Sequence, residues 1–199
     1  MINAIKKYLP LTSEEKTEIW KNAIFVFDTN ILLNLYRYTS KTRKQLFEAL
    51  YKLRNRIWIP AHVVDEFWKD REKVISETIK VYSNIQHQIE QLLKKIKEDL
   101  KINENDKELK SLKKTILKWF EKNKQENLVV IDDSNDEILS ELLKIFSGKV
   151  GKGFSEEEIS GIELEGKERF EKQIPPGYED LNKTNKDNVY GDLIIWKEI

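Results

Sequence analysis

The stretch FVFDTNILLNLY, residues 25–36, decides the fold that the sequence predicts. Residues 23–27 form a continuous apolar and β-rich run, which is typical of a strand covered on both faces in a parallel sheet. Asp28, Thr29 and Asn30 interrupt this run, and apolar residues then resume with helical character. Three polar side chains directly after a buried strand indicate either a capped turn into a helix or a functional site at the strand end.

Two further apolar runs extend the predicted sheet. Residues 57–59 form a short β-rich run that Pro60 stops, and residues 128–131 form another run that acidic residues close. Helical segments lie between these runs, so the order predicts a βαβ unit with parallel strands. Helices are predicted at residues 13–22, 40–53, 62–76, 136–146, 155–173 and 192–199.

Residues 69–124 are rich in charge and carry a thread of apolar residues. These recur at three- and four-residue steps over residues 85–100 and again over residues 109–120, with the polar residues 103–106 between. The spacing predicts two amphipathic helices that fold back as a hairpin. A helix with many charged residues usually exposes them to solvent. We therefore interpret the hairpin as a scaffold inserted into a single domain over residues 1–199.

The composition excludes several classes of site. The chain has 35 basic and 35 acidic residues, no Cys and two His, so its net charge is zero. The absence of Cys excludes disulfides and thiolate zinc sites, and two His argue against a zinc site built on His. A charged partner therefore needs a local site. No stretch approaches the ~18 apolar residues of a membrane span, so we predict a cytoplasmic protein without a membrane partner.

Three acidic residues from distant parts of the chain are predicted to meet at one edge of the sheet. Asp28 ends the first strand, Glu66 lies on the helix after the second strand, and Asp192 opens the last helix. Carboxylates gathered in this way repel one another unless a cation compensates, and Mg²⁺ or Mn²⁺ prefers carboxylate oxygen. Because carboxylate-held metal can activate water and neutralise a scissile phosphate, the three acids predict hydrolysis of a phosphodiester.

Three segments, taken together and in this order, resemble the PIN-like nucleases, specifically a bacterial group with a long helical insertion. They are FVFDTNILLNLYRY (25–38), IWIPAHVVDEFWKDR (57–71) and IPPGYEDLNKTNKDNVYGDLIIW (174–196). The resemblance implies the α/β class, as a three-layer α/β/α sandwich with a central parallel sheet, and a metal-dependent nuclease that cuts RNA or single-stranded DNA. Asp28, Glu66 and Asp192 match the three acids of the family's motif. Asn30 matches the polar companion of the first acid.

One part of the family's pattern is missing. PIN nucleases usually carry a further acid after a later strand, and the sequence has no such strand after the helix of Asp192. That helix reaches Ile199 without a capping residue, so we expect the natural chain to continue. Either the missing strand lies beyond Ile199 or the activity is compromised, because three acids alone are expected to bind metal weakly.

Each acidic candidate has a structural alternative. Asp28 and Asp192 can each be explained as helix caps. Glu66 can be explained as a solvent-facing acid of its helix, and Asp65 is its rival, since it is the adjacent residue on the same predicted helix. Asp192 has two rivals nearby, which are Asp180 and Asp187.

Three cations near the acids are predicted to contact substrate. Arg71 follows Glu66 on the same helix, and Lys183 and Lys186 precede Asp192. Such cations position the phosphate backbone of a nucleic acid without reading its sequence.

Two other features receive no catalytic role. GKVGKG, residues 148–153, has part of the glycine spacing of a phosphate-binding loop, but Phe154 stands where the lysine belongs, so we interpret it as a flexible loop. His62 follows the strand-ending Pro60 and is interpreted as structural.

The sequence also allows other functions. A catalytically inactive PIN-like module could bind a partner protein, or a second copy of itself as a homodimer, through the hairpin of residues 69–124. A nucleotide-binding α/β domain is a third hypothesis, which predicts affinity for ATP or NAD that does not depend on the acids.

Overall fold

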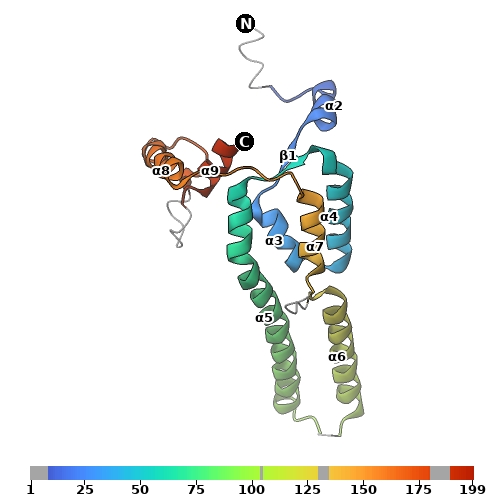
Figure 1. Ribbon diagram of the computed structural model, residues 1–199. Helices are drawn as coiled ribbons and strands as arrows, with labels where there is room; N and C mark the ends of the chain where they lie inside the picture. Colours follow the sequence, from blue (N-terminus) through green and yellow to red (C-terminus); the bar gives the residue numbers. More distant parts are fainter. Residues whose placement is uncertain (1–8, 104, 130–134, 180–188) are drawn as a thin grey trace.

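The fold is built mainly from helices, and the structure, a computed structural model, describes residues 9–103, 105–129, 135–179 and 189–199. Its elements in chain order are α2 (Ser13–Asn22), β1 (Phe25–Val26), α3 (Thr29–Arg37), α4 (Ser40–Leu53), the 3-10 helix η2 (Arg54–Arg56), β2 (Ile57–Trp58), α5 (Ala61–Asp99), α6 (Lys107–Asn127), α7 (Glu137–Phe146), α8 (Glu156–Glu171) and α9 (Gly191–Glu198) (Figure 1).

The two strands β1 and β2 lie side by side and run parallel, with Phe25 opposite Ile57. Helices α3 and α4 connect them, so the predicted βαβ pairing of these two apolar runs is confirmed. Beyond β2, Ile59 forms a further parallel bridge with Val150. The carboxyl ends of both strands therefore lie at the same edge.

The predicted three-layer α/β/α sandwich with a central parallel sheet is wrong. Helices make up 75% of the described structure, and its sheet has two strands of two residues each. The run 23–27 is not covered on both faces, because Ile24 is 68% exposed and the preceding α2 buries no residue. A short apolar run does not by itself distinguish a central strand from a segment that packs by one side.

The predicted third strand at residues 128–131 lies only partly in the described structure. Leu128 and Val129 are half-buried and belong to no strand. Residues 130 and 131 lie outside the described residues.

The main core lies between α3, α4, α7 and the first turns of α5. Helix α3 packs along α5, and five of its nine residues are buried. Its apolar residues follow one another almost without interruption, so several sides of the helix are covered. Fully burying one such aliphatic side chain stabilises a fold by about 1.5–3 kcal/mol, so α3 is firmly anchored. The buried members of this core include Leu32, Leu33, Leu35, Tyr36, Leu50, Val63, Phe67, Val74, Ile138, Leu142 and Ile145.

The predicted helix at 62–76 and the first half of the hairpin form one continuous helix, α5, of 39 residues. Helix α6 returns beside the second half of α5 (Figure 1). Beyond Val74, the buried residues of these two helices are Leu93 and Phe120. None of the described helices is long and apolar enough to cross a membrane.

A second, smaller cluster joins α8 to α9. Ile162 of α8 packs with Leu193 and Ile194 of α9. Gly166 permits this close approach, because a Cβ at that position would lie 2.5 Å from the ring of Tyr190. Helix α9 also contacts α5, so the cluster is attached to the main core at the start of α5.

Candidate functional site

Asp28 lies between β1 and α3 at the carboxyl end of the strand. It occupies the position before the first residue of α3, but its side chain makes no capping hydrogen bond. Its Oδ2 instead accepts a hydrogen bond of 2.9 Å from Nδ2 of Asn30, and both residues are exposed. Asp28 is therefore the N-cap residue of α3 by position without capping it through its side chain, and its carboxylate is presented at the surface beside an amide.

Glu66 is joined to the residue next to Asp28. The hydroxyl of Thr29, a residue only 5% exposed, donates a hydrogen bond to Oε2 of Glu66. His62, one turn earlier on α5, places its Nε2 3.6 Å from Oε1 of Glu66. The rival Asp65 is exposed. The structure therefore brings Glu66 against Thr29, the residue that follows Asp28 in the chain.

The parallel register explains why these two acids lie at the same edge of the strands. Phe25 is level with Ile57, so Asp28 and Pro60 stand the same number of residues further along their strands. Helix α5 begins directly after Pro60, and its second turn carries Glu66 back against the start of α3. The carboxyl edge of parallel strands is the usual position of a ligand in such folds.

Asp192 lies in the first turn of α9, in the smaller cluster. It faces Gly177, since a Cβ added there would lie 3.0 Å from Cβ and 3.4 Å from Oδ2 of Asp192. Within the described parts of the chain, no group of three His, Cys, Asp or Glu residues is placed to hold a metal ion. The structure thus places Glu66 against the neighbour of Asp28 but does not gather all three predicted acids into one metal site.

Sequence reasoning missed a fourth acid, Glu198, at the end of α9. Its Oε1 accepts from the backbone N–H of Ala61 at 2.9 Å and of Gly153 at 3.0 Å, and its Oε2 lies 3.5 Å from the backbone N of His62. The carboxylate therefore caps α5 from a distant part of the chain, where the free N–H groups of a helix favour an anion. One signal was available, because Pro60 precedes α5 and provides no capping side chain.

The loop at residues 148–153 packs around this carboxylate. A Cβ at Gly151 would lie 2.1 Å from Oε1 of Glu198 and 2.7 Å from the ring of Trp58. The backbone N–H of Gly151 also donates to the carbonyl of Ile59 at 2.9 Å. The glycine-rich loop therefore does hold an anion, and that anion is a side chain of the protein itself.

Arg71, a predicted phosphate contact, is engaged inside the domain. Its Nε donates to Oη of Tyr36 at 2.9 Å and to Oδ2 of Asp136 at 3.0 Å. The side chains of Arg71 and Asp136 are only 12% and 7% exposed. Burial alone would lower the pKa of Arg71, but the hydrogen bonds with Asp136 and Tyr36 outweigh it and raise that pKa. The other two predicted cations, Lys183 and Lys186, lie outside the described residues.

Asp136 connects this buried pair to the start of α7. Its Oδ2 accepts from Oη of Tyr36 at 2.7 Å, and its Oδ1 accepts from the backbone N–H of Leu139 at 2.9 Å. Burial is the main reason that the pKa of Tyr36 is raised, so its hydroxyl stays protonated. One carboxylate thus caps α7 and neutralises Arg71 at the same time.

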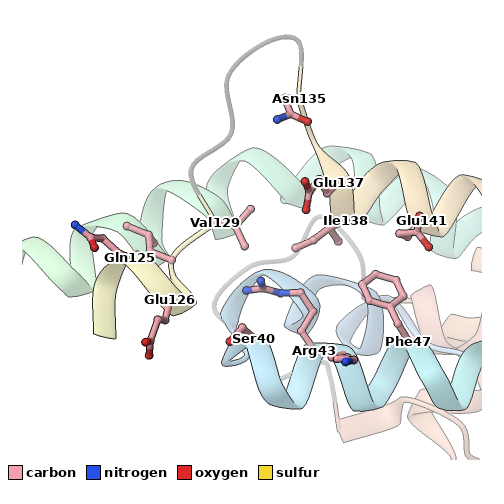
Figure 2. Close-up of a pocket in the computed structure, with 12 residues that line it drawn as sticks. Ser40, Arg43, Phe47, Gln125, Glu126, Val129, Asn135, Glu137, Ile138 and Glu141 are labelled. Atoms are coloured by element: carbon pink, nitrogen blue, oxygen red, sulfur yellow. The ribbon is translucent and has the colours of Figure 1, made fainter. Parts of the chain in front are cut away.

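A separate hollow opens between α4, the end of α6 and the start of α7 (Figure 2). Two cations, Arg43 and Lys44, line it, and Arg43 donates to the main-chain oxygens of Leu35, Tyr38 and Asn127 at 2.8–3.0 Å. Burial lowers the pKa of Arg43. Because this guanidinium already joins α3, α4 and α6, the edge with Asp28 and Glu66 is the stronger candidate site.

The comparisons with known proteins agree with the resemblance seen in the sequence. A family model described as a PIN-like domain matches residues 24–199, which is most of the chain. The matched region includes both strands, the Asp28 edge, the hairpin and the cluster of α8 and α9. No curated protein and no solved structure matches the chain.

Proposed function

Because the chain belongs to the PIN-like domain family, we propose that it is a divalent-metal-dependent nuclease that hydrolyses phosphodiester bonds of RNA or single-stranded DNA. One observation supports this proposal more than any other. Asp28 lies at the carboxyl edge of two parallel strands, next in the chain to Thr29, whose hydroxyl is bonded to Glu66; the carboxylate of Asp28 is exposed and does not cap its helix.

The donor chemistry of this edge fits Mg²⁺ or Mn²⁺. Mg²⁺ is commonly held by one or two carboxylates together with waters and substrate phosphates, so Asp28 and Glu66 would be sufficient as its first protein ligands. A bound ion would supply charge neutralisation for the scissile phosphate and an activated water. We assign Asp192 as the third acid on the family's pattern. It lies on α9, which also contacts α5.

The residues around the two acids orient them. Asn30 holds the carboxylate of Asp28 through its amide, and the buried hydroxyl of Thr29 holds that of Glu66. His62 lies on the other oxygen of Glu66. Carboxylates fixed in this way lose little further freedom when they bind a cation, which favours a preorganised site.

A cleavage assay tests the proposal. Labelled RNA and labelled single-stranded DNA are each incubated with the chain in Mg²⁺ or Mn²⁺ and, separately, in a chelator. The wild-type chain is expected to cut only with metal. Loss of a partner that merely supports a ligand commonly costs ~10–100-fold, so Asp28→Asn is expected to lower the rate by at least about 100-fold. Asp65→Asn removes an exposed carboxylate next to Glu66 and is the matched control. Equal cleavage by wild type and Asp28→Asn would refute the proposed function.

A further inference from the structure

The outer face of α6 carries a row of lysines that points away from the fold. All members are exposed and recur at three- and four-residue steps, which places them on one face of a helix. The opposite face holds the buried Phe120 and the half-buried Ile116, which pack toward α5. The lysine row consists of Lys107, Lys110, Lys114, Lys118 and Lys122.

Positive charge is concentrated on this helix although the whole chain is neutral. Helix α6 contains seven lysines and three glutamates, whereas α8 contains seven glutamates and two basic residues. Among the described residues, Lys107, Lys114 and Lys118 form no ion pair with a carboxylate, and the pair of Lys122 with Glu126 spans 3.7 Å at the surface. The row is therefore available to an anionic partner.

A large aromatic side chain adjoins the lysine row. Trp119 is 62% exposed, and it borders a hollow of about 470 Å³ between α5 and α6 that Val81, Tyr82 and Ile85 also line. Proteins that bind single strands without sequence preference combine cations along the phosphates with aromatic faces on which bases stack. Lys118 and Lys122 of the row stand one and three residues from Trp119, so the indole borders the row on the flank of α6 that turns toward this hollow.

We propose that this side of α6 binds single-stranded nucleic acid, with phosphates along the lysine row and a base on the indole of Trp119. The proposal rests on the proposed nuclease function and adds to it a single-stranded substrate class and a binding surface away from the acids. A single strand is favoured over a duplex, because a base has to be unstacked before it can reach the indole.

A second copy of the chain fits this surface less well. The acidic α8 is the obvious complementary surface, but Glu165 is already bonded to Lys197 at 2.7 Å and to Arg169 at 3.3 Å. Glu158 is engaged by Ser155 in the cap of the same helix. The carboxylates of α8 are therefore only partly available to the lysine row.

The lysine row is remote from the two acids. Glu66 and Tyr82 are both on α5 and are separated by sixteen residues, which corresponds to about 24 Å along the helix axis. The ring of Tyr82 lies 6.0 Å from that of Phe120, so α6 meets α5 at this level. A strand with the ~3.4 Å rise per nucleotide of a duplex strand covers this distance in about seven nucleotides.

Fluorescence anisotropy tests the proposal. The 199-residue chain is titrated against labelled single strands of about 30 nucleotides, in the presence of a chelator and at several salt concentrations. The combined substitution Lys114→Ala, Lys118→Ala and Lys122→Ala is expected to weaken binding at least about tenfold. It is also expected to lower the slope of log affinity against log salt by about 2, since each contact to a single strand contributes ~0.7.

Two further variants sharpen this test. Lys16→Ala, Lys21→Ala and Lys167→Ala together remove the same charge from exposed positions on α2 and α8, and are expected to leave affinity and slope unchanged. Trp119→Ala is expected to weaken binding about fivefold or more, and Trp119→Phe much less, because a stacked base needs an aromatic face.

Equal weakening in the two triple variants, or an unchanged salt slope, would overturn the proposal. So would a wild-type chain that binds neither RNA nor DNA but forms salt-sensitive dimers that the α6 variant abolishes, because a second copy would then cover α6. Binding that depends on α6 without any metal-dependent cleavage would uphold this surface and remove the proposed nuclease. Cleavage that requires Asp28, together with binding that the α6 substitutions do not change, would uphold the proposed nuclease and overturn the α6 surface.

Discussion

The two ends of α5 are held in different ways. The first turns pack with α3, α4 and α7, and we call these four parts the body. The rest of α5 and all of α6 form the hairpin. In the body, Val63 and Phe67 are at most 4% exposed, whereas Ile85 and Leu92 of the hairpin are 41% and 59% exposed. In the body, several elements pack around each buried side chain. In the hairpin, the two helices cover each other incompletely and leave a surface for binding. Substitutions are therefore expected to cost stability in the body and affinity in the hairpin.

The largest loss of stability is expected for Asp136→Ala in the body. This change leaves the buried guanidinium of Arg71 unpaired and removes the cap of α7. Breaking a buried pair by removing one partner typically costs about 3–5 kcal/mol. Denaturant unfolding measures the change. Asp136→Asn keeps an oxygen for the cap and is expected to cost less. A loss below about 1 kcal/mol would show that the pair adds little to the body.

A matched pair of truncations compares the body and the hairpin directly. Leu35→Ala in the body removes a fully buried side chain and is expected to lower the free energy of unfolding by about 2–5 kcal/mol. Ile85→Ala in the hairpin removes a half-exposed side chain and is expected to cost less than about 1 kcal/mol, as surface changes usually do. Similar losses for both variants would contradict the distinction between the two regions.

A smaller effect is expected where α9 meets the body. Glu198→Ala removes one charged acceptor that the backbone N–H groups of Ala61 and Gly153 share, and is expected to cost about 1.5–3 kcal/mol in total. Gly151→Ala introduces a methyl group against the same carboxylate and is expected to cost about 1–3 kcal/mol. The double variant is expected to lose less than the sum, because truncating Glu198 makes room for the methyl group. Strict additivity of the two unfolding free energies would argue against this contact.

Local patterns in the sequence were sufficient for much of the helical structure. The three- and four-residue steps predicted helices on both sides of residues 103–106, and the structure has α5 and α6 there. The apolar runs at Phe25 and Ile57 were correctly paired as parallel strands. The extent of the sheet was overestimated, because a run of apolar residues does not reveal whether a second layer covers it. Burial of this kind depends on the whole fold.

The parts of the site that depend on contacts between distant residues could not be predicted. Glu198 reaches the start of α5 across 137 positions of the chain, and Arg71 pairs with Asp136 across 65. The sequence placed Asp28 and Glu66 at one edge because strand ends can be read locally. It contained no sign that the Thr29 hydroxyl binds Glu66, since a buried threonine looks like any other in sequence.

Calorimetric titration with Mn²⁺ tests most directly whether Asp28 and Glu66 act as one cation-binding pair. The wild-type chain is expected to bind Mn²⁺, and Asp28→Asn and Glu66→Gln are each expected to weaken binding by at least about tenfold. Asp65→Asn is expected to bind as the wild type does. Unchanged Mn²⁺ affinity in both Asp28→Asn and Glu66→Gln would contradict the account.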